Sequence, residues 1–177
     1  DPSTLSLLQI TSMPVFSRVR GLAVVSHPSK ETQVLVVLSE ASKVSFVEYN
    51  IQSDALICTG SASIVGFSGA VDEHLPRNEA RLIVSHPRRN IVAVASFNST
   101  VSVFPILTTA GKVCAGTVVS KRVDGVIMSL DFIEDEDDAD GRSILIALCQ
   151  EGSRQHISIL TVNRLSENNK TEMSLTS

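Results

Sequence analysis

The sequence predicts an all-β protein that forms part of a β-propeller. Three features lead to this prediction: a strand pair that recurs along the chain, apolar runs of five residues without a polar interruption, and short polar turns between the strands. A run that is apolar at every position indicates a strand covered on both faces. The middle strand of a propeller blade, with a neighbouring blade on each side, has this environment.

The repeated strand reads apolar, serine, apolar, apolar, any residue, apolar. It occurs as VSFVEY, VSVFPI and ISILTV, which begin at Val44, Val101 and Ile157 and therefore lie 57 and 56 residues apart. The runs VLVVL, IVAVA and ILIAL precede these strands, and the turns SEASK, SFNST and CQEGSRQH connect each pair. Short polar turns between apolar strands are typical of antiparallel hairpins. A fixed period of this length indicates a repeat architecture.

Each unit also has a strand before and after this hairpin. The preceding strands are RGLAVVS, ARLIVS and VIMSLDF, and the following ones are ALICTGS, VCAGTVVSK at 113–121 and a segment near EMSLTS. We therefore expect three four-stranded blades at residues 18–63, 79–122 and 125–177, the last one incomplete. Val36, Val94 and Ile146 should occupy equivalent buried strands.

The opening residues 1–14, which contain STLSLLQITS, should form the outer strand of a preceding blade. Propellers close with about 4–8 blades, so three blades do not complete a ring. We expect residues 1–177 to be a single partial propeller, a fragment that presents two broad apolar blade faces to its missing neighbours.

The amino-acid composition argues against several classes of protein. Hydrophobic residues make up 43% of the 177 residues, which is too apolar for a disordered chain, and no apolar run approaches the length of a membrane-spanning helix. A net charge of −4 argues against an autonomous nucleic-acid binder, which needs lysine and arginine to neutralise phosphates. Cys58, Cys114 and Cys149 are far apart in apolar strands, so we expect buried, reduced thiols.

No catalytic, cofactor-binding or metal-ligating set is predicted. The acidic run EDEDDADG at 134–141 lacks the first ligand and the closing glutamate of a calcium loop, and indicates a solvated loop. His27 and His86 end equivalent strands, about one blade apart. We expect each imidazole to hydrogen-bond a turn carbonyl while the following proline stops the strand.

Two polar segments are candidates for partner contacts, because loops on a rigid scaffold often bind partners. The long linker 64–80 carries the first group of candidates, and the turn after the next strand carries the second. An ordinary polar loop is the alternative for both segments. The candidate residues are Asp72, Glu73, His74, Arg77, Arg88 and Arg89.

The turn and the strand that follows it resemble a known family. In that family a blade strand ends in Asp-Pro, a basic residue follows shortly, and a later strand ends in a V-x-x-x-P-L/I run. Pro87, Arg88 or Arg89, and the run 101–106 match this pattern, whereas His86 replaces the aspartate. The family is the first propeller of the large subunit of the UV-damaged-DNA-binding complex, the A subunit of cleavage and polyadenylation specificity factor, and the large splicing factor 3b subunit. A WD-repeat protein fits less well, because the chain has no tryptophan.

This resemblance implies a nuclear scaffold of several propellers, with a cytoplasmic pool also allowed, that has no catalytic activity. One branch of the family is a ubiquitin-ligase adaptor that recruits substrate receptors to a cullin. The alternative is a nucleic-acid-binding subunit of an mRNA 3′-end processing or splicing complex. The implied partners are other protein subunits, with at most indirect or weak nucleic-acid contact, and neither a membrane nor a small-molecule substrate.

Overall fold

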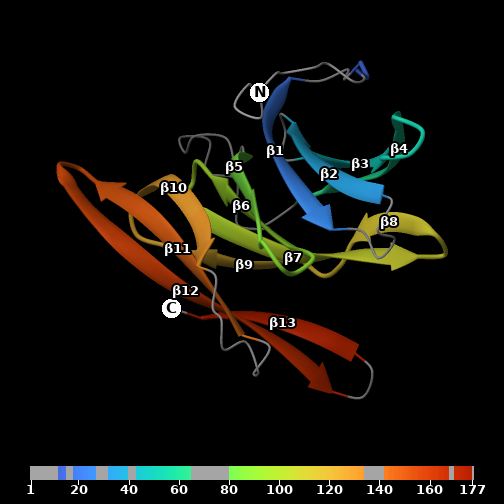
Figure 1. Ribbon diagram of the computed structural model, residues 1–177. Coiled ribbons are helices and arrows are strands. Elements are labelled where there is room, and N and C mark those ends of the chain that lie inside the picture. Colours follow the sequence, from blue (N-terminus) through green and yellow to red (C-terminus); the bar gives the residue numbers. More distant parts are fainter. Residues whose placement is uncertain are drawn as a thin grey trace, which may run out of the picture.

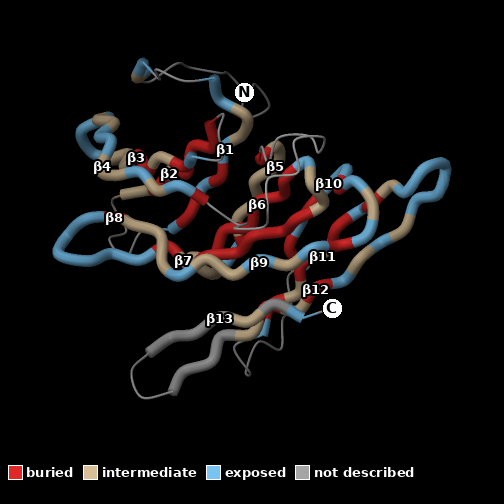
Figure 2. The backbone as a smooth tube through the Cα atoms, turned by 180° about the vertical axis from the view of Figure 1, so that it is seen from behind, coloured by how far each residue is buried: buried red, intermediate tan, exposed pale blue. Residues whose placement is uncertain are grey.

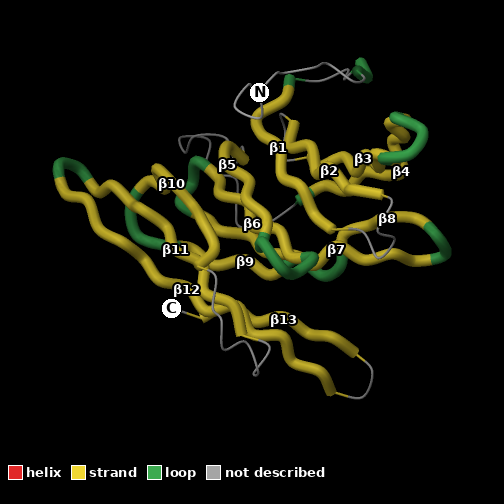
Figure 3. The backbone as a smooth tube through the Cα atoms, in the orientation of Figure 1, coloured by secondary structure: helices red, strands yellow, loops and turns green. Residues whose placement is uncertain are grey.

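The protein is all-β in the residues that its computed structural model describes, which are 12–14, 18–26, 32–39, 43–64, 80–133, 142–167 and 170–176. These residues form three antiparallel sheets and contain no helix (Figures 1 and 3). The all-β prediction is confirmed, and three sheets of this kind agree with a partial propeller. Within this part of the chain, no helix is long and apolar enough to cross a membrane.

Each sheet follows the order of the chain. Sheet 1 contains β1 (Val19–Ser26), β2 (Thr32–Ser39), β3 (Lys43–Asn50) and β4 (Ala55–Ser63). Sheet 2 contains β5 (Ala80–Ser85), β6 (Ile91–Ser96), β7 (Thr100–Thr109), β8 (Lys112–Ala115) and β9 (Val119–Arg122). Sheet 3 contains β10 (Val126–Ile133), β11 (Arg142–Glu151), β12 (Arg154–Glu167) and β13 (Lys170–Thr176). Sheet 3 has four strands, and its last strand, β13, contains the segment near EMSLTS where the sequence predicts it. Residues 1–11 of the predicted outer strand at 1–14 lie outside the described residues.

The two central strands have the same register in all three sheets. Val36 pairs with Phe46 in sheet 1, and Ile146 pairs with Ile159 in sheet 3. The equivalent pair in sheet 2 is Ala93 with Val103. The sequence repeat is therefore a structural repeat at the level of single residue pairs. Val94 is buried, but it lies one residue past the position equivalent to Val36.

A β-bulge recurs at one position of the first strand of each sheet. The register shifts around Arg20 in β1, around Arg81 in β5 and around Met128 in β10. A bulge adds one unpaired residue to a strand and increases its local twist. The three sheets therefore share an irregularity that the sequence pattern does not reveal.

The outer strand of sheet 2 is divided, although the sequence predicted one strand over 113–121. Pro105 of β7 has no N–H to donate to an outer neighbour, and its carbonyl accepts a hydrogen bond from the Gly116 N–H at 2.8 Å. A Cβ atom on Gly116 would lie 2.6 Å from Pro105 Cγ, so glycine is required where the chain passes this close to the Pro105 ring. The chain breaks here into β8 and β9, which pair with the two halves of β7.

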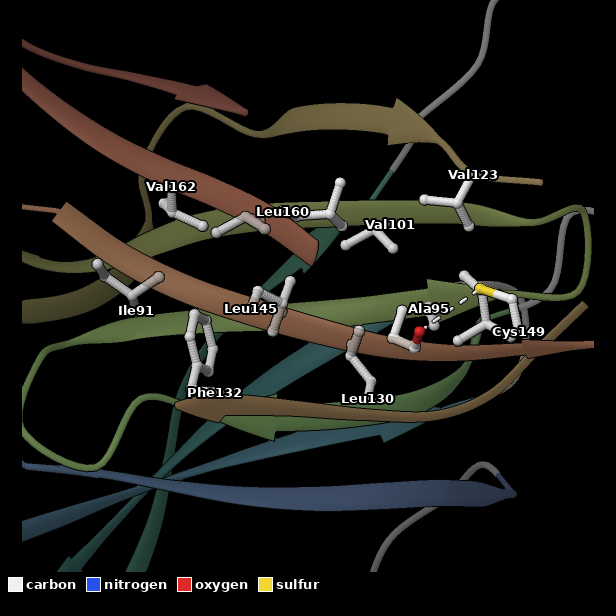
Figure 4. Packing of buried hydrophobic residues seen from close by; sticks show 14 residues of the cluster. Ile91, Ala95, Val101, Val123, Leu130, Phe132, Leu145, Cys149, Leu160 and Val162 are labelled. Carbon is white, nitrogen blue, oxygen red and sulfur yellow. Dashed lines mark hydrogen bonds between the residues drawn. The ribbon is translucent and has the colours of Figure 1, made fainter. Parts of the chain in front are cut away.

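Two hydrophobic clusters lie between the sheets, where the buried segments are red in Figure 2, and Figure 4 shows the cluster between sheets 2 and 3. One joins sheet 1 to sheet 2 and includes Phe46 and Phe104, both at most 1% exposed. The other joins sheet 2 to sheet 3 and includes Leu145 and Phe132. Every residue of β6 is buried, as predicted for the middle strand of a blade.

The cysteine prediction is only partly correct. Cys149 is fully buried between sheets 2 and 3, but Cys114 is partly exposed and Cys58 is exposed. Cys58 lies on β4, the outermost strand of sheet 1, opposite Val47. Outer strands have fewer neighbours, so an apolar sequence around a cysteine does not ensure its burial there.

Candidate functional site

The structure separates the six predicted contact residues. Asp72, Glu73, His74 and Arg77 fall in 65–79, outside the described residues, so their role stays a prediction. Arg88 and Arg89 lie in the turn between β5 and β6, which the structure describes in full.

This turn is built around His86, whose side chain is only 6% exposed. The His86 N–H donates to the Ile91 carbonyl at 2.9 Å, and the Ile91 N–H donates to the Arg89 carbonyl at 2.8 Å. Imidazole Nδ1 of His86 accepts a hydrogen bond from the Arg88 N–H at 3.1 Å. The sequence predicts a bond from the ring to a turn carbonyl, and the bond that the structure shows at Nδ1 is with an N–H. A carboxylate can accept from the same N–H, as in an Asx turn, which explains why histidine can stand where the family pattern has aspartate.

The turn also joins sheet 2 to sheet 3. The His86 ring packs against Phe132 of β10, with ring centroids 5.1 Å apart and an interplanar angle of 58°. The Arg89 guanidinium donates to Ser143 Oγ of β11 at 3.1 Å, and Ser143 is 1% exposed. Arg89 is therefore directed into the contact between two sheets, whereas Arg88 is exposed. The two arginines do not form one contact surface.

A larger candidate surface is the apolar face of sheet 3 that points away from sheet 2. It is formed by alternate residues of β11 and β12. Ile157 is 66% exposed and Ile159 is 58% exposed. The residues of this face are Ile144, Ile146, Leu148, Ile157 and Ile159.

The equivalent positions in the other sheets are buried. In sheet 1 they are Val34, Val36, Leu38, Val44 and Phe46, each at most 1% exposed. In sheet 2 they are Ile91, Ala93, Ala95, Val101 and Val103, each at most 5% exposed. The face of sheet 3 thus has the composition of a sheet-to-sheet contact without a covering sheet. The sequence predicts that Ile146 is buried in the intact protein, and in the described structure it lies on this face and is partly exposed.

The sequence contained the signal for this surface. Aligning the three repeats places Ile157 with Val44 and Val101, which lie on the covered faces of sheets 1 and 2. The alignment therefore identifies the residues of the equivalent face in sheet 3. The alignment does not say whether that face is covered, because this depends on what lies next to it in space.

A third feature combines charge with an exposed aromatic ring. The Arg81 guanidinium lies 5.1 Å from the centroid of the Phe97 ring, which is 37% exposed. Arg122, at the end of β9, is exposed and pairs with Thr100 of the same sheet. Both arginines thus lie at the end of sheet 2 that carries the β6–β7 turn. In the described ranges no group of three histidine, cysteine or carboxylate side chains could hold a metal ion.

Comparisons with known proteins agree with this architecture. The family profile described as the RSE1/DDB1/CPSF1 first β-propeller matches residues 1–176. A crystal structure of a protein from Lactobacillus plantarum has a similar fold, with a TM-score of 0.56 and 16% sequence identity. The similarity covers 94% of this chain and 43% of that chain, so this chain spans less than half of it. No curated protein sequence matches the chain. The family match extends over nearly every residue, and the chain belongs to the RSE1/DDB1/CPSF1 first β-propeller family.

Proposed function

We propose that this chain is part of a non-enzymatic, multi-propeller nuclear adaptor that holds other protein subunits together. The adaptor resembles the damaged-DNA-binding subunit that links substrate receptors to a cullin-RING ubiquitin ligase. Membership of the family supports a protein-interaction scaffold in a multi-subunit complex. The observation that carries the proposal is the family match over residues 1–176, and the apolar face of sheet 3 is a contact surface for a further blade or for a partner.

The energetic argument rests on the exposed isoleucines. Moving a large aliphatic side chain from water into an apolar contact contributes about 1.5–3 kcal/mol. Ile157 and Ile159 are both more than half exposed, and Leu148 beside them is 36% exposed. Together they provide an apolar centre of the kind that stable protein contacts bury. A polypeptide surface matches this chemistry, whereas a small polar substrate does not.

The test is to identify the proteins that co-purify with the tagged full-length protein from its native cells. We expect stoichiometric protein partners. Cullin and ubiquitin-ligase components would assign the chain to the adaptor branch of the family. A full-length protein that purifies without any stoichiometric partner would contradict the scaffold function.

A second candidate function is a nucleic-acid-binding subunit of an mRNA 3′-end processing or splicing complex. The arrangement of Arg81, Phe97 and Arg122 favours it, because cations at the surface bind phosphates and an exposed ring can stack a base; Arg122 is exposed and Arg81 is partly exposed. Polyadenylation or splicing subunits among the co-purified proteins would support this branch. RNA binding should then weaken steeply with salt, and the double substitution Arg81→Glu, Arg122→Glu should reduce both the affinity and the salt dependence. Affinity unchanged by these substitutions would exclude this surface.

A further inference from the structure

The end of sheet 2 that carries the β6–β7 turn contains a line of residues from four strands. Ala80 of β5 pairs with Ser96 of β6. Thr100 of β7 pairs with Arg122 of β9, and the turn joins Ser96 to Thr100. Arg81, the bulged residue next to Ala80, lies at one end of this line, and Arg122 lies at the other. We call the line from Arg81 to Arg122 the cationic row.

The length of the cationic row follows from sheet geometry. Neighbouring strands of a sheet are about 4.8 Å apart. The row crosses three such spacings, from β5 through β6 and β7 to β9, so the backbones of its two arginines are about 14 Å apart. An extended polypeptide advances about 3.3 Å per residue and directs alternate side chains to the same side. Residues i and i+4 of an extended segment, about 13 Å apart on one side, therefore match the row.

The charge at this end of sheet 2 is positive. Arg122 is exposed and Arg81 is partly exposed, and neither forms an ion pair with a carboxylate in the part of the chain that the structure describes. Lys121 adds a third cation, and the one described carboxylate that follows in sequence, Asp124, lies beyond Arg122 in the link to β10. The whole chain has a net charge of −4. A positive end on an acidic chain is complementary to an acidic partner.

The Phe97 ring holds the Arg81 side chain in place. The guanidinium carbon of Arg81 lies over this ring, 5.1 Å from its centroid. A stacked guanidinium keeps its N–H groups in its own plane, where two of them can donate parallel hydrogen bonds to one carboxylate. Because the side chain is already ordered, binding costs less conformational entropy. The geometry at Arg81 thus suits a carboxylate.

The turn in the middle of the cationic row has unsatisfied polar atoms. Thr100 is 1% exposed, and its Oγ1 has no hydrogen-bond partner among the described residues. The same holds for the buried Oδ1 of Asn98. Ser99, between them, has a φ of 65°, in the left-handed region that residues other than glycine rarely adopt. Natural proteins concentrate such locally unfavourable features at binding sites, so this turn is not arranged for stability alone.

We propose that the cationic row binds an acidic, extended segment of a partner polypeptide, with one carboxylate on Arg81 and a second, four residues away in the segment, on Arg122. The inference rests on the proposed scaffold function and specifies the chemistry of one partner. A nucleic-acid strand matches the row less well. Arg81 covers one face of the Phe97 ring on which a base would stack, and Asp124 would repel a phosphate backbone that continued past Arg122.

The test measures the binding of labelled peptides to the full-length protein by fluorescence anisotropy at low ionic strength. The probe is a nine-residue peptide of threonine and serine with glutamate at its third and seventh positions. One control peptide has glutamine at both positions, and the other has its two glutamates at adjacent positions, which keeps the charge and changes the spacing. We expect the probe to bind at least about tenfold more tightly than the glutamine peptide and more tightly than the adjacent-glutamate peptide. Its affinity should fall as salt is added.

Substitutions in the protein locate the binding site. Arg122→Glu replaces an attraction by a repulsion and should weaken probe binding by at least about tenfold. The matched control is Lys112→Glu, which makes the same charge change on an exposed residue of β8, at the opposite end of sheet 2, and should change the affinity by less than about twofold. Phe97→Leu keeps an apolar side chain but removes the ring beneath Arg81, so it should weaken binding by several-fold. The melting temperatures of all three variants should stay close to that of the wild type, because the three residues are exposed.

Three results would overturn the inference. The first is absence of probe binding, or equal binding of the adjacent-glutamate peptide, which would reduce the row to a general charge attraction. The second is an unchanged probe affinity of Arg122→Glu. The third is a single-stranded oligouridylate that displaces the probe and loses affinity in Arg122→Glu, which would assign the row to nucleic acid. The scaffold function is judged separately: if the wild type co-purifies with stoichiometric partners, Arg122→Glu retains all of them and the probe does not bind, the row proposal fails and the scaffold function stands.

Discussion

Sheets 2 and 3 have the same register, the same bulge and the same apolar positions, but different surroundings. Sheet 2 is covered by sheet 1 on one face and by sheet 3 on the other, and every residue of β6 is buried. Sheet 3 is covered on one face, and β11 alternates between buried and exposed positions (Figure 2). The strand pattern fixes which residues share a face, whereas the neighbouring sheet decides whether that face is buried.

The largest expected effect compares two neighbouring residues of β11. Leu145 is fully buried between sheets 2 and 3, so Leu145→Ala should cost about 2–5 kcal/mol in the free energy of unfolding. Ile146 faces away from sheet 2 and is partly exposed, so Ile146→Ala should cost less than about 1 kcal/mol. Urea denaturation of both variants measures the difference. Equal costs would show that both faces of sheet 3 are covered in solution.

A smaller effect is expected where the outer strand of sheet 2 divides. Gly116→Ala places a methyl group against the Pro105 ring and should cost about 1–3 kcal/mol in the free energy of unfolding. Pro105→Ala removes the nearest atom of that ring, so the double variant should recover part of the loss. Strictly additive costs in this double-mutant cycle would mean that the two residues do not interact.

The link between sheets 2 and 3 should contribute less. Arg89→Met removes the hydrogen bond to the buried Ser143 hydroxyl and should cost about 1 kcal/mol in the free energy of unfolding. The control is Arg88→Met, which changes the exposed neighbour and should cost less. If the two variants are equally stable, Arg89 does not stabilise the contact between the sheets.

The smallest expected effect is a shift in the pKa of Tyr49, which reports on the local folding of sheet 1. Tyr49 donates a hydrogen bond to Asp54 Oδ1 at 2.7 Å, and this bond, with burial and the carboxylate charge, raises the pKa of Tyr49 above its ordinary value of 10.0. Asp54→Asn should lower that pKa toward 10.0, because it removes the negative charge that disfavours the phenolate. Tyr49 is the only tyrosine in the chain, so an ultraviolet titration reads this group alone. An unchanged pKa would mean that the β3–β4 turn does not hold the two side chains together.

Much of the fold was predictable because it depends on short-range patterns. The spacing of Val44, Val101 and Ile157 identified the repeat, and the polar turns identified the hairpins. The division of β8 from β9 was missed, because it depends on Pro105 and Gly116 meeting across two strands. The sequence predicts a partner contact for Arg89 and does not reveal that its guanidinium reaches Ser143 of the next sheet. The residues of the outer face of sheet 3 followed from the repeat, whereas their exposure depends on what lies next to sheet 3 in space.

The central claim is that the apolar face of sheet 3 is a contact surface, covered in the full-length protein by a further blade or by a partner. The most direct measurement compares the proteins that co-purify with the full-length wild type and with the Ile157→Lys, Ile159→Lys variant. A matched control is Ile57→Lys on β4, because Ile57 and Ile159 are both 58% exposed and belong to different sheets. The account predicts that the double variant loses at least one stoichiometric partner or has a lower melting temperature than the wild type, while the control shows neither change. A double variant that is as stable as the wild type and retains every partner would contradict the claim.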